Sequence, residues 1–305
     1  MNIVFMGTPS YAILTLEMLH QHYGIALVVT QPDKKVGRKG EIELSPVKQF
    51  ALENHIPLFQ PDKMKMDYQP ILDVKPDLII TAAYGQMIPE AVLNAATSLN
   101  LHGSLLPKYR GGAPVQYAIK LGDTKTGVTL MYMAKKMDAG DMIAKKETDI
   151  TPTDTTGTLM AKLGILAAEL LYEQLPLILA GKHDRVKQNE ADVTFAYNIK
   201  PEEEILDFNQ TSEALLNHLR SLLPTPGASI FIKGVRIKVY EMEKSDIISH
   251  EAPGTVISDR KTLLVKTGNG VVSLLSIQPE NKKVMMAKDF LNGQKLLTKG
   301  DVFNT

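Results

Sequence analysis

The first half of the chain alternates between short apolar runs and longer stretches with helical periodicity. The apolar runs have the length and composition of buried strands and lie at residues 2–6, 25–30, 78–82, 98–102 and 128–133. Helical stretches lie between them, at about residues 8–20, 46–54 and 114–121, the first with Thr8 as N-cap and Pro9 at the first helical position. This alternation predicts a parallel, Rossmann-like sheet, in which ligands bind beyond the carboxyl ends of the strands.

The pattern changes in the second half of the chain. Residues 154–180 are mostly helical, whereas residues 181–204 lose apolar periodicity, gather charge and contain Pro201, as linkers do. Five short strands separated by Gly, Asn and Asp turns follow, at residues 229–232, 235–240, 255–257, 263–266 and 271–275. Five such strands predict a small barrel. We therefore expect a first domain over residues 1–188, a linker over 189–206 and a second domain over 207–305.

Composition agrees with two ordinary domains. At 305 residues and 44% hydrophobic, the chain can bury a core in each of them. The absence of Cys excludes a thiol nucleophile, disulfides and Cys-ligated metal sites. The N-terminal residues lack a basic segment, their apolar run is too short for a signal peptide, and no later segment is apolar enough to span a membrane. We expect a cytoplasmic protein with no membrane association.

Charge is balanced over the whole chain, with 34 Lys and Arg against 34 Asp and Glu. Residues 207–305 carry 13 basic and 10 acidic residues, a surplus of three, which leaves 21 basic and 24 acidic residues before them. This surplus permits a nucleic-acid-binding face on the second domain without requiring one, because surface charges also serve to solvate a protein.

Two polar side chains lie on one face of the expected strand at residues 98–102. Alternate residues of a strand point to the same side, so Asn100 and His102 converge on one small volume. An amide NH and an imidazolium NH in a water-poor pocket can stabilise an oxygen that gains negative charge as a carbonyl carbon is attacked. The alternative is that Asn100 ends the strand through a turn bond and that His102 is an ordinary core histidine.

Carboxylates follow the next expected strand, in the turn that holds Asp138 and Asp141. A carboxylate beside His102 would help to keep the imidazole cationic and could relay a proton through water. Asp near Gly is also what a tight turn favours, and this reading is the stronger one for Asp141.

The sequence lacks the motifs of three other kinds of site: a dinucleotide-binding site, a serine-hydrolase site and a metal site. The turn after the first strand holds Gly7, Thr8 and Pro9 in place of the Gly-rich fingerprint of dinucleotide-binding enzymes. No Gly-x-Ser-x-Gly elbow surrounds Ser104, which argues against a serine hydrolase. His20 and His22 would point to different sides of a helix, so we expect no metal site.

Several longer motifs together resemble the folate-dependent formyltransferases, and among them most closely those that act on methionyl-tRNA. The Ser-Leu-Leu-Pro-x-Tyr-x-Gly loop at residues 104–111 is specific for the superfamily, whereas the Gly-Thr-Pro start and the C-terminal Lys-Lys region narrow the resemblance to the tRNA enzymes. The match runs almost end to end and includes residues 3–9, 29–33, 45–48, 83–86, 278–283 and 287–291.

This resemblance implies an activity and a set of site residues. The family's catalytic Asn, His and Asp fall on Asn100, His102 and Asp138. The implied reaction transfers the formyl group of 10-formyltetrahydrofolate to the α-amino group of methionine on initiator tRNA. In it, Asn100 and His102 stabilise the oxyanion while Asp138 orients His102 and assists proton transfer. The resemblance places folate contacts at Tyr84, Gly85, Gln86, Ser104, Leu105, Leu106 and Pro107.

The tRNA contacts implied by the resemblance lie in two regions. The polar connection over residues 31–44 is either a solvated loop or a phosphate-binding one, with Arg38 as the key contact beside Lys34, Lys35 and Lys39. The implied OB-like second domain offers Lys282, Lys283 and Lys288, for which surface solvation is the alternative. We expect a monomer. The family often carries Trp between two prolines where this chain has Thr225, so some interdomain packing must differ.

Two other functions are compatible with the same motifs. An enzyme of this superfamily could formylate an amino sugar nucleotide, although such a substrate needs neither the Arg38 loop nor the second domain. A tRNA-binding module without catalysis is the third reading, against which the intact Asn100, His102 and Asp138 argue.

Overall fold

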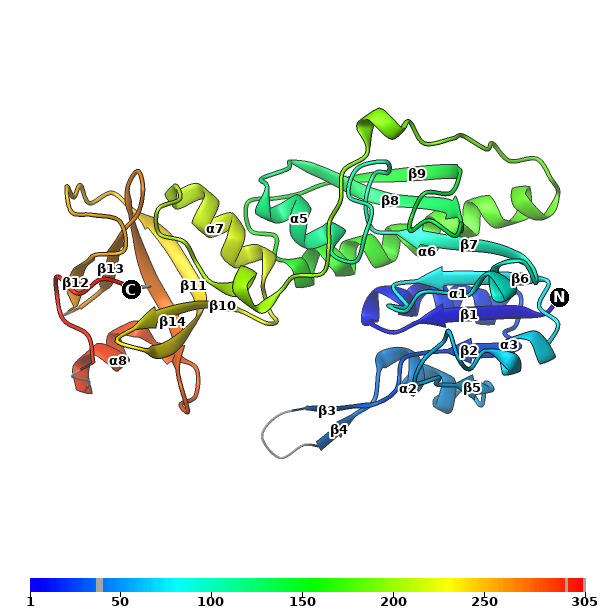
Figure 1. Ribbon diagram of the computed structural model, residues 1–305, viewed down its shortest axis with the longest axis horizontal. Coiled ribbons are helices and arrows are strands. Elements are labelled where there is room, and N and C mark those ends of the chain that lie inside the picture. The colour runs from blue at the N-terminus through cyan, green and yellow to red at the C-terminus, as the bar shows by residue number, and fades with distance from the viewer. Residues whose placement is uncertain (37–40, 260, 294–295, 304–305) are drawn as a thin grey trace. The chain divides into compact units, whose positions relative to one another are not determined.

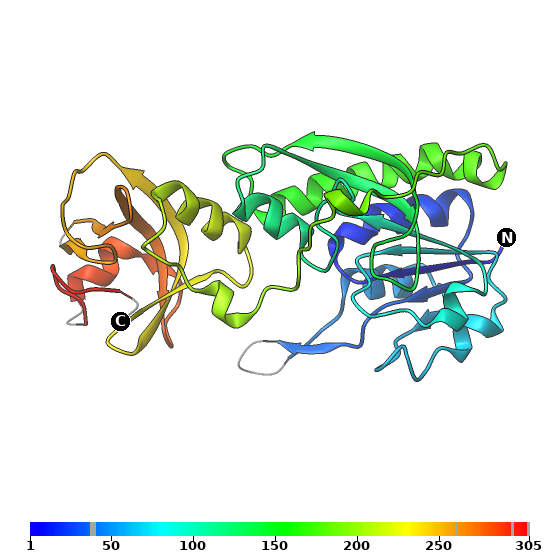
Figure 2. The same cartoon turned by 45° about the horizontal axis from the view of Figure 1, so that its top comes forward.

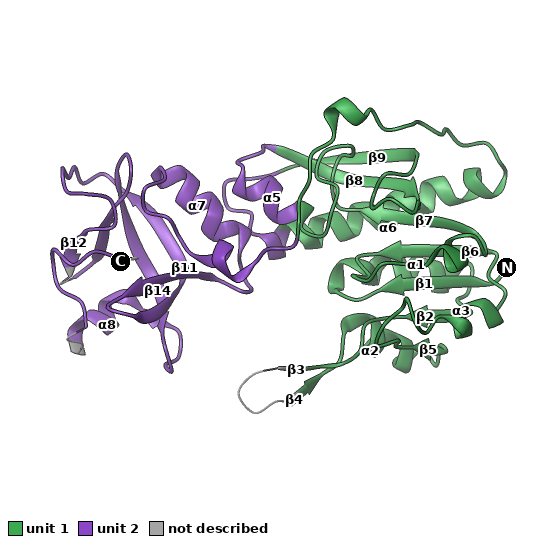
Figure 3. Cartoon of the chain, in the orientation of Figure 1, with its two compact units in different colours: residues 1–114, 125–149, 159–197 green, residues 115–124, 150–158, 198–305 purple. Residues whose placement is uncertain are grey.

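The computed structural model describes residues 1–36, 41–259, 261–293 and 296–303 (Figure 1). These residues divide into two compact units, coloured separately in Figure 3. The first unit comprises residues 1–114, 125–149 and 159–197, and the second comprises residues 115–124, 150–158 and 198–305. Among the residues described, we find no helix whose length and hydropathy would let it span a bilayer.

A seven-stranded sheet forms the centre of the first unit, in the order β5-β2-β1-β6-β7-β8-β9 (Figure 1). The pairs among β1, β2, β5, β6 and β7 are parallel, whereas β8 pairs with β7 and β9 pairs with β8 in antiparallel orientation. The strands are β1 Ile3–Gly7, β2 Leu27–Val29, β5 Leu58–Phe59, β6 Leu78–Ala82, β7 Thr97–His102, β8 Lys125–Tyr132 and β9 Met142–Asp149. This parallel-dominated sheet confirms the predicted Rossmann-like fold.

Helices and one hairpin complete the first unit, and Figure 2 shows the hairpin extending away from the sheet. The hairpin pairs β3 Lys34–Val36 with β4 Glu41–Glu43. The helical segments are η1 Ser10–Ala12, α1 Ile13–His22, α2 Pro46–Glu53, α3 Gln69–Asp73, α4 Glu90–Leu93, η2 Glu190–Asp192 and most of α6 Thr156–Leu179. At α2 the hydroxyl of Ser45 accepts from the Lys48 N–H at 3.1 Å, which caps the helix start.

The predicted helix start at Thr8 is wrong. The chain first makes the 3-10 turn η1, and α1 begins only at Ile13. The Thr8 hydroxyl instead donates to the carbonyl oxygen of Tyr84 at 3.0 Å. A residue 76 positions away therefore engages the hydroxyl that would otherwise cap the helix.

The second unit is built on a curled antiparallel sheet in the order β10-β11-β14-β13-β12, with β15 beside β14. Its strands are β10 Ala228–Ile232, β11 Val235–Ser245, β12 Val256–Asp259, β13 Leu263–Lys266, β14 Val271–Pro279 and β15 Met285–Met286. Its helical segments are α5 Pro114–Lys120, η3 Pro201–Glu204, α7 Ser212–Ser221 and α8 Ala287–Gly293. The sheet confirms the predicted OB-like class.

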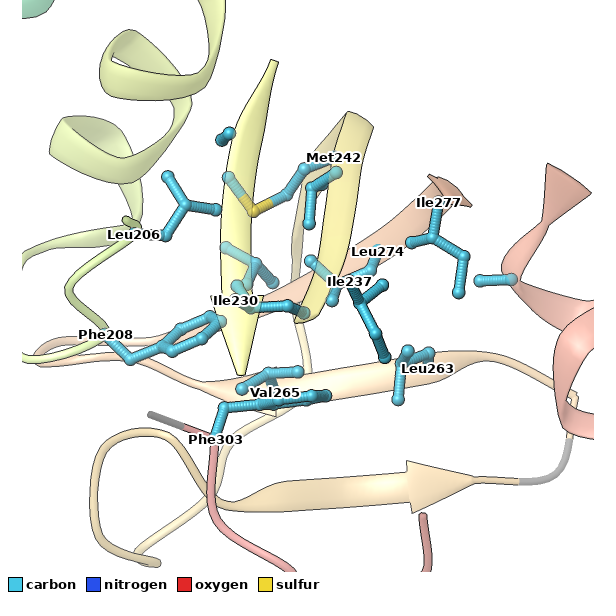
Figure 4. Packing of buried hydrophobic residues seen from close by; sticks show 14 of the residues in the cluster. Leu206, Phe208, Ile230, Ile237, Met242, Leu263, Val265, Leu274, Ile277 and Phe303 are labelled. Carbon is cyan, nitrogen blue, oxygen red and sulfur yellow. The ribbon is translucent and has the colours of Figure 1, made fainter. Parts of the chain in front are cut away.

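One hydrophobic cluster holds the second unit together (Figure 4). It joins Ile230 and Ile237 of the first two strands to Leu263 and Leu274, and Phe208 stacks with Phe303 at a centroid distance of 5.8 Å. Because side chains from strands far apart in the sequence meet in this cluster, burial of their apolar surface stabilises the curled sheet.

Candidate active site

Asn100 lies near the carboxyl end of β7, between its neighbours Thr81 on β6 and Met131 on β8. The Thr81 hydroxyl donates to Asn100 Oδ1 at 2.9 Å, and Thr81 itself is 2% exposed. This bond fixes the amide so that Nδ2 points to the carboxylate of Asp138, 3.4 Å from its Oδ1. The Asn100 amide NH is therefore held in a fixed direction near the carboxyl end of β7.

His102 lies two residues further along β7 and is buried. Its Nε2 lies 2.8 Å from the carbonyl oxygen of Tyr109. Because a carbonyl can only accept, Nε2 carries the proton of this bond. The remaining nitrogen, Nδ1, faces Asp138 Oδ2 at 3.7 Å. Nε2 therefore anchors the imidazole ring to the backbone, and Nδ1 faces the Asp138 carboxylate.

Asp138 completes the cluster from the turn between β8 and β9, with φ at +49°. Its Oδ2 accepts from the Gly111 N–H at 2.9 Å, so the loop after β7 and this turn are tied together. The structure therefore brings Asn100, His102 and Asp138 into one site. Asp141 lies apart from this cluster, because its carboxylate pairs with Arg185 Nε at 2.7 Å.

Gln188, which the sequence did not single out, holds the Asp138 turn in place. Its Nε2 donates to the carbonyl oxygens of Asp138 and Gly140, at 2.8 Å each. Its Oε1 accepts from Arg110 Nε at 2.9 Å. The turn therefore depends on a residue 50 positions further along the chain.

Arg110, whose side chain is 0% exposed, forms the base of this network. Its Nη2 donates to Glu190 Oε1 at 2.8 Å, and its Nη1 has no hydrogen-bond partner among the described residues. Hydrogen bonds from Arg110 and Lys136 lower the pKa of the Glu190 carboxyl to about 2. A guanidinium withdrawn from water needs such partners, which explains why the side chains of Gln188 and Glu190 both turn toward Arg110.

The loop of residues 104–107, predicted to contact folate, is fixed by Thr129 of β8. The Thr129 hydroxyl donates to the carbonyl oxygen of Ser104 at 2.7 Å and accepts from the Leu106 N–H at 3.0 Å. Ser104 and Leu106 are buried, whereas Leu105 and Pro107 are partly exposed. The Nζ of Lys145 donates to the carbonyl oxygen of Leu106, and burial lowers the pKa of this amine.

The second predicted folate segment, Tyr84 to Gln86, follows the carboxyl end of β6. Gly85 has φ at +89°, a backbone conformation that favours glycine. Gln86 uses both ends of its amide within the protein, on the Met64 N–H and the Pro61 carbonyl. The Tyr84 ring packs in a hydrophobic cluster, where burial raises the pKa of its hydroxyl. That hydroxyl has no hydrogen-bond partner in the part of the chain described.

The predicted tRNA-binding residues lie in both units. Lys34 is exposed on β3, and Lys35 follows it in the same strand. Arg38 and Lys39 lie outside the described residues. Lys282 and Lys283, together with Lys288 at the start of α8, are exposed in the second unit. The folate segments and the catalytic candidates all belong to the first unit.

No group of three or more potential metal ligands occurs in the described ranges. The rings of His20 and His22 pack on different partners, since His20 meets Phe50 edge-on at 5.9 Å and His22 meets Tyr172 at 5.3 Å. The two imidazoles of α1 therefore contribute to packing at separate places.

Comparison with known proteins gives consistent results along the chain. The Formyl transferase family model matches residues 1–175, and the model of the Formyl transferase C-terminal domain matches residues 198–295. The methionyl-tRNA formyltransferase of Latilactobacillus sakei subsp. sakei (strain 23K) is 46% identical over 299 residues, which cover 96% of this chain and 94% of that protein.

Two solved structures show the same fold. HypX from Aquifex aeolicus in complex with tetrahydrofolic acid gives a TM-score of 0.65 at 18% identity, over 95% of this chain and 47% of HypX, so the chain spans about half of that protein. Methionyl-tRNA formyltransferase from Clostridium thermocellum gives a TM-score of 0.57 at 18% identity, over 81% of this chain and 94% of that one. With the family models covering both regions and near-full-length relatives above 40% identity, the chain belongs to the methionyl-tRNA formyltransferase family.

Proposed function

We propose that this protein transfers the formyl group of 10-formyltetrahydrofolate to the α-amino group of methionine on initiator tRNA. The observation that carries the proposal is the convergence of Asn100, His102 and Asp138 at one edge of the sheet, in a chain that belongs to this family. Acyl transfer needs stabilisation of a developing negative charge on oxygen and removal of a proton from the amine, and these three side chains offer both.

Each residue has a distinct proposed role. Asn100 Nδ2 is a donor whose direction is set by Thr81, so it can stabilise the formyl oxygen as the amine attacks. Nδ1 of His102 supplies a second donor when the ring is cationic. Asp138 lies within 3.7 Å of that nitrogen and is fixed by the Gly111 N–H, so it can orient the ring and receive the proton that the amine loses. The formyl carbon–N10 bond then breaks, the proton passes to N10, and tetrahydrofolate leaves.

The residues at this edge fit a folate. Tyr84 to Gln86 and Ser104 to Pro107 follow adjacent parallel strands, so both segments border the same edge. The buried Tyr84 hydroxyl, which lacks a partner among the described residues, and the buried Arg110 Nη1 are donors that a ligand rich in amide and carboxylate groups could satisfy. We propose Tyr84, Gly85, Gln86 and Ser104, Leu105, Leu106, Pro107 as the folate-binding residues, with 10-formyltetrahydrofolate as co-substrate.

The tRNA would be held by residues of both units. We propose Arg38, Lys39, Lys34 and Lys35 in the first and Lys282 and Lys283 in the second, because Lys and Arg are the side chains that neutralise phosphates. In domain terms, residues 1–188 would catalyse, residues 189–206 would link, and residues 207–305 would bind tRNA. The protein would act as a monomer in the cytoplasm, where initiator tRNA is used.

The test is transfer of labelled formyl from 10-formyltetrahydrofolate to three acceptors in parallel: initiator Met-tRNA, elongator Met-tRNA and a uridine-diphosphate amino sugar. We expect selective labelling of the initiator. Labelling of the sugar alone would contradict the proposal and favour the amino-sugar activity, and labelling of none would point to a binding module. The Asn100→Ala variant should lose about 100-fold or more in turnover, the usual effect of removing one oxyanion donor.

A further inference from the structure

Two aromatic side chains, Phe195 and Tyr197, form an exposed parallel stack at the end of the first unit. Their ring centroids lie 5.6 Å apart and their planes differ by 1°. Phe195 is 43% exposed and Tyr197 is 57% exposed. Of the Phe and Tyr residues that the structure describes, only these two and Tyr172 are exposed to this degree. Two of the three exposed rings therefore gather at one place.

The backbone fixes this pair in position. Ala196, between the two rings, is fully buried; its N–H donates to the Arg110 carbonyl at 2.8 Å, and its carbonyl accepts from the Ala113 N–H at 3.0 Å. Alternate residues of an extended segment point to opposite sides, so anchoring Ala196 inward turns both rings outward. The backbones of Gly111 and Ala196 pack so closely that a Cβ on Gly111 would lie 2.4 Å from the Ala196 carbonyl oxygen.

The stack is adjacent to the catalytic carboxylate through the same backbone. Phe195 forms a parallel bridge with Arg110, and bridged segments lie about 5 Å apart. The next residue, Gly111, donates its N–H to Asp138 Oδ2 at 2.9 Å. The segment that leads to the stack, residues 182–194, is balanced in charge, with Lys182, Arg185 and Lys187 against Asp184, Glu190 and Asp192. An exposed aromatic platform thus borders the proposed reaction site.

We propose that Phe195 and Tyr197 form a stacking platform for the 3′-terminal nucleobase of the aminoacyl-tRNA, an inference that rests on the proposed function. The reacting amine is joined through an ester to the 3′-terminal ribose, so the bases at that end must lie close to Asn100, His102 and Asp138 when the amine does. Exposed aromatic faces bind unpaired bases by stacking, whatever the base.

The absence of Trp from the chain provides a direct measurement. The Tyr197→Trp variant carries a single tryptophan, whose fluorescence we expect to be quenched when Met-tRNA is added. A Met-tRNA whose 3′-terminal nucleotide lacks its base should quench much less. This titration needs no turnover, so a protein that stacks the 3′ end but transfers no formyl group would retain this inference and refute the proposed function.

Kinetics provide the second readout. Phe195→Leu and Tyr197→Leu should each raise the KM for Met-tRNA about tenfold, the size expected for one lost stacking contact, and should change the KM for 10-formyltetrahydrofolate less than twofold. Tyr172→Leu, which removes a comparably exposed ring from α6, is the matched control and should leave both values unchanged.

Three results would overturn the inference. They are an unchanged KM for Met-tRNA in both leucine variants, a rise confined to the KM for the folate, and equal quenching of Tyr197→Trp by the intact and the abasic tRNA. On the abasic tRNA, the leucine variants should match the unsubstituted protein, because the contact that they remove is already missing.

Discussion

Replacing Gln188 by Leu should release the turn that carries Asp138. The side chain makes three hydrogen bonds, two to carbonyl oxygens of the turn at 2.8 Å and one from the buried guanidinium of Arg110 at 2.9 Å. Leucine has a similar volume but no polar atoms, so all three bonds are lost. Among the described residues, the Arg110 side chain then keeps its hydrogen bond to Glu190 alone.

The magnitude follows from those bonds. A neutral hydrogen bond contributes about 1 kcal/mol to the free energy of unfolding and one from a charged group about 2 kcal/mol, which gives about 4 kcal/mol in all. Gln188 is only partly buried, so water recovers part of this loss and we expect about 2 to 3 kcal/mol. Turnover should fall about tenfold or more, because the Asp138 carboxylate is no longer held beside His102.

Urea unfolding measures the first effect, and formyl transfer at saturating substrates measures the second. The matched control is Gln49→Leu, since Gln49 is exposed and its amide makes one bond, to the Leu44 carbonyl at 3.2 Å. We expect that control to lie within about 0.5 kcal/mol of the unsubstituted protein. If Gln188→Leu behaved like Gln49→Leu in both assays, the network would not position the turn and the reasoning would be refuted.

Three further predictions concern the same region. Thr129→Val keeps the shape of a buried side chain but removes its two bonds to the loop at residues 104–107, so urea unfolding should show a loss of about 1 to 3 kcal/mol; no change would mean that these bonds do not hold the loop. The pKa of Glu190 is about 2 in the folded protein against 4.5 ordinarily, so its contribution to stability is present above about pH 4.5 and is lost as pH falls toward 2. The urea midpoint of Glu190→Gln should therefore fall less steeply than that of the unsubstituted protein over this window, and parallel curves would contradict the pairing. Gly111→Ala combines φ at +127° with a Cβ 2.4 Å from a carbonyl oxygen and should greatly reduce formyl transfer; Gly181→Ala, with φ at +65° and open space, should not.

Local sequence patterns correctly predicted those strands and helix starts that depend only on residues close together in the chain. The alternation of β7 placed Asn100 and His102 on one side, because the side-chain period of a strand does not depend on its neighbours. The buried strands β1 and β6 were predicted because both are apolar at nearly every position, as strands covered on both faces are. The predicted helix start at Pro46 is likewise correct, since α2 begins there.

The remainder depends on contacts between distant residues. β9 was missed because its outer half alternates with exposed charged residues and offers few apolar positions. The local sequence around Thr8 predicts a helix N-cap. The sheet brings Tyr84 beside Thr8, and the Thr8 hydroxyl donates to its carbonyl oxygen instead. Gln188 and Glu190 lie in a segment without periodicity, and only the buried guanidinium of Arg110 explains why polar side chains meet there. Such hydrogen-bond networks produce no regular spacing of residues in the sequence, so they cannot be predicted from a sequence pattern.

The most direct test of the account is the single-turnover rate of formyl transfer from 10-formyltetrahydrofolate to Met-tRNA in the Asp138→Asn variant. Asparagine keeps an acceptor for the Gly111 N–H but removes the charge that faces His102 at 3.7 Å. We predict a rate at least about 100-fold below that of the unsubstituted protein, with tRNA binding unchanged. A rate within threefold would contradict the assignment of Asn100, His102 and Asp138 as the catalytic site.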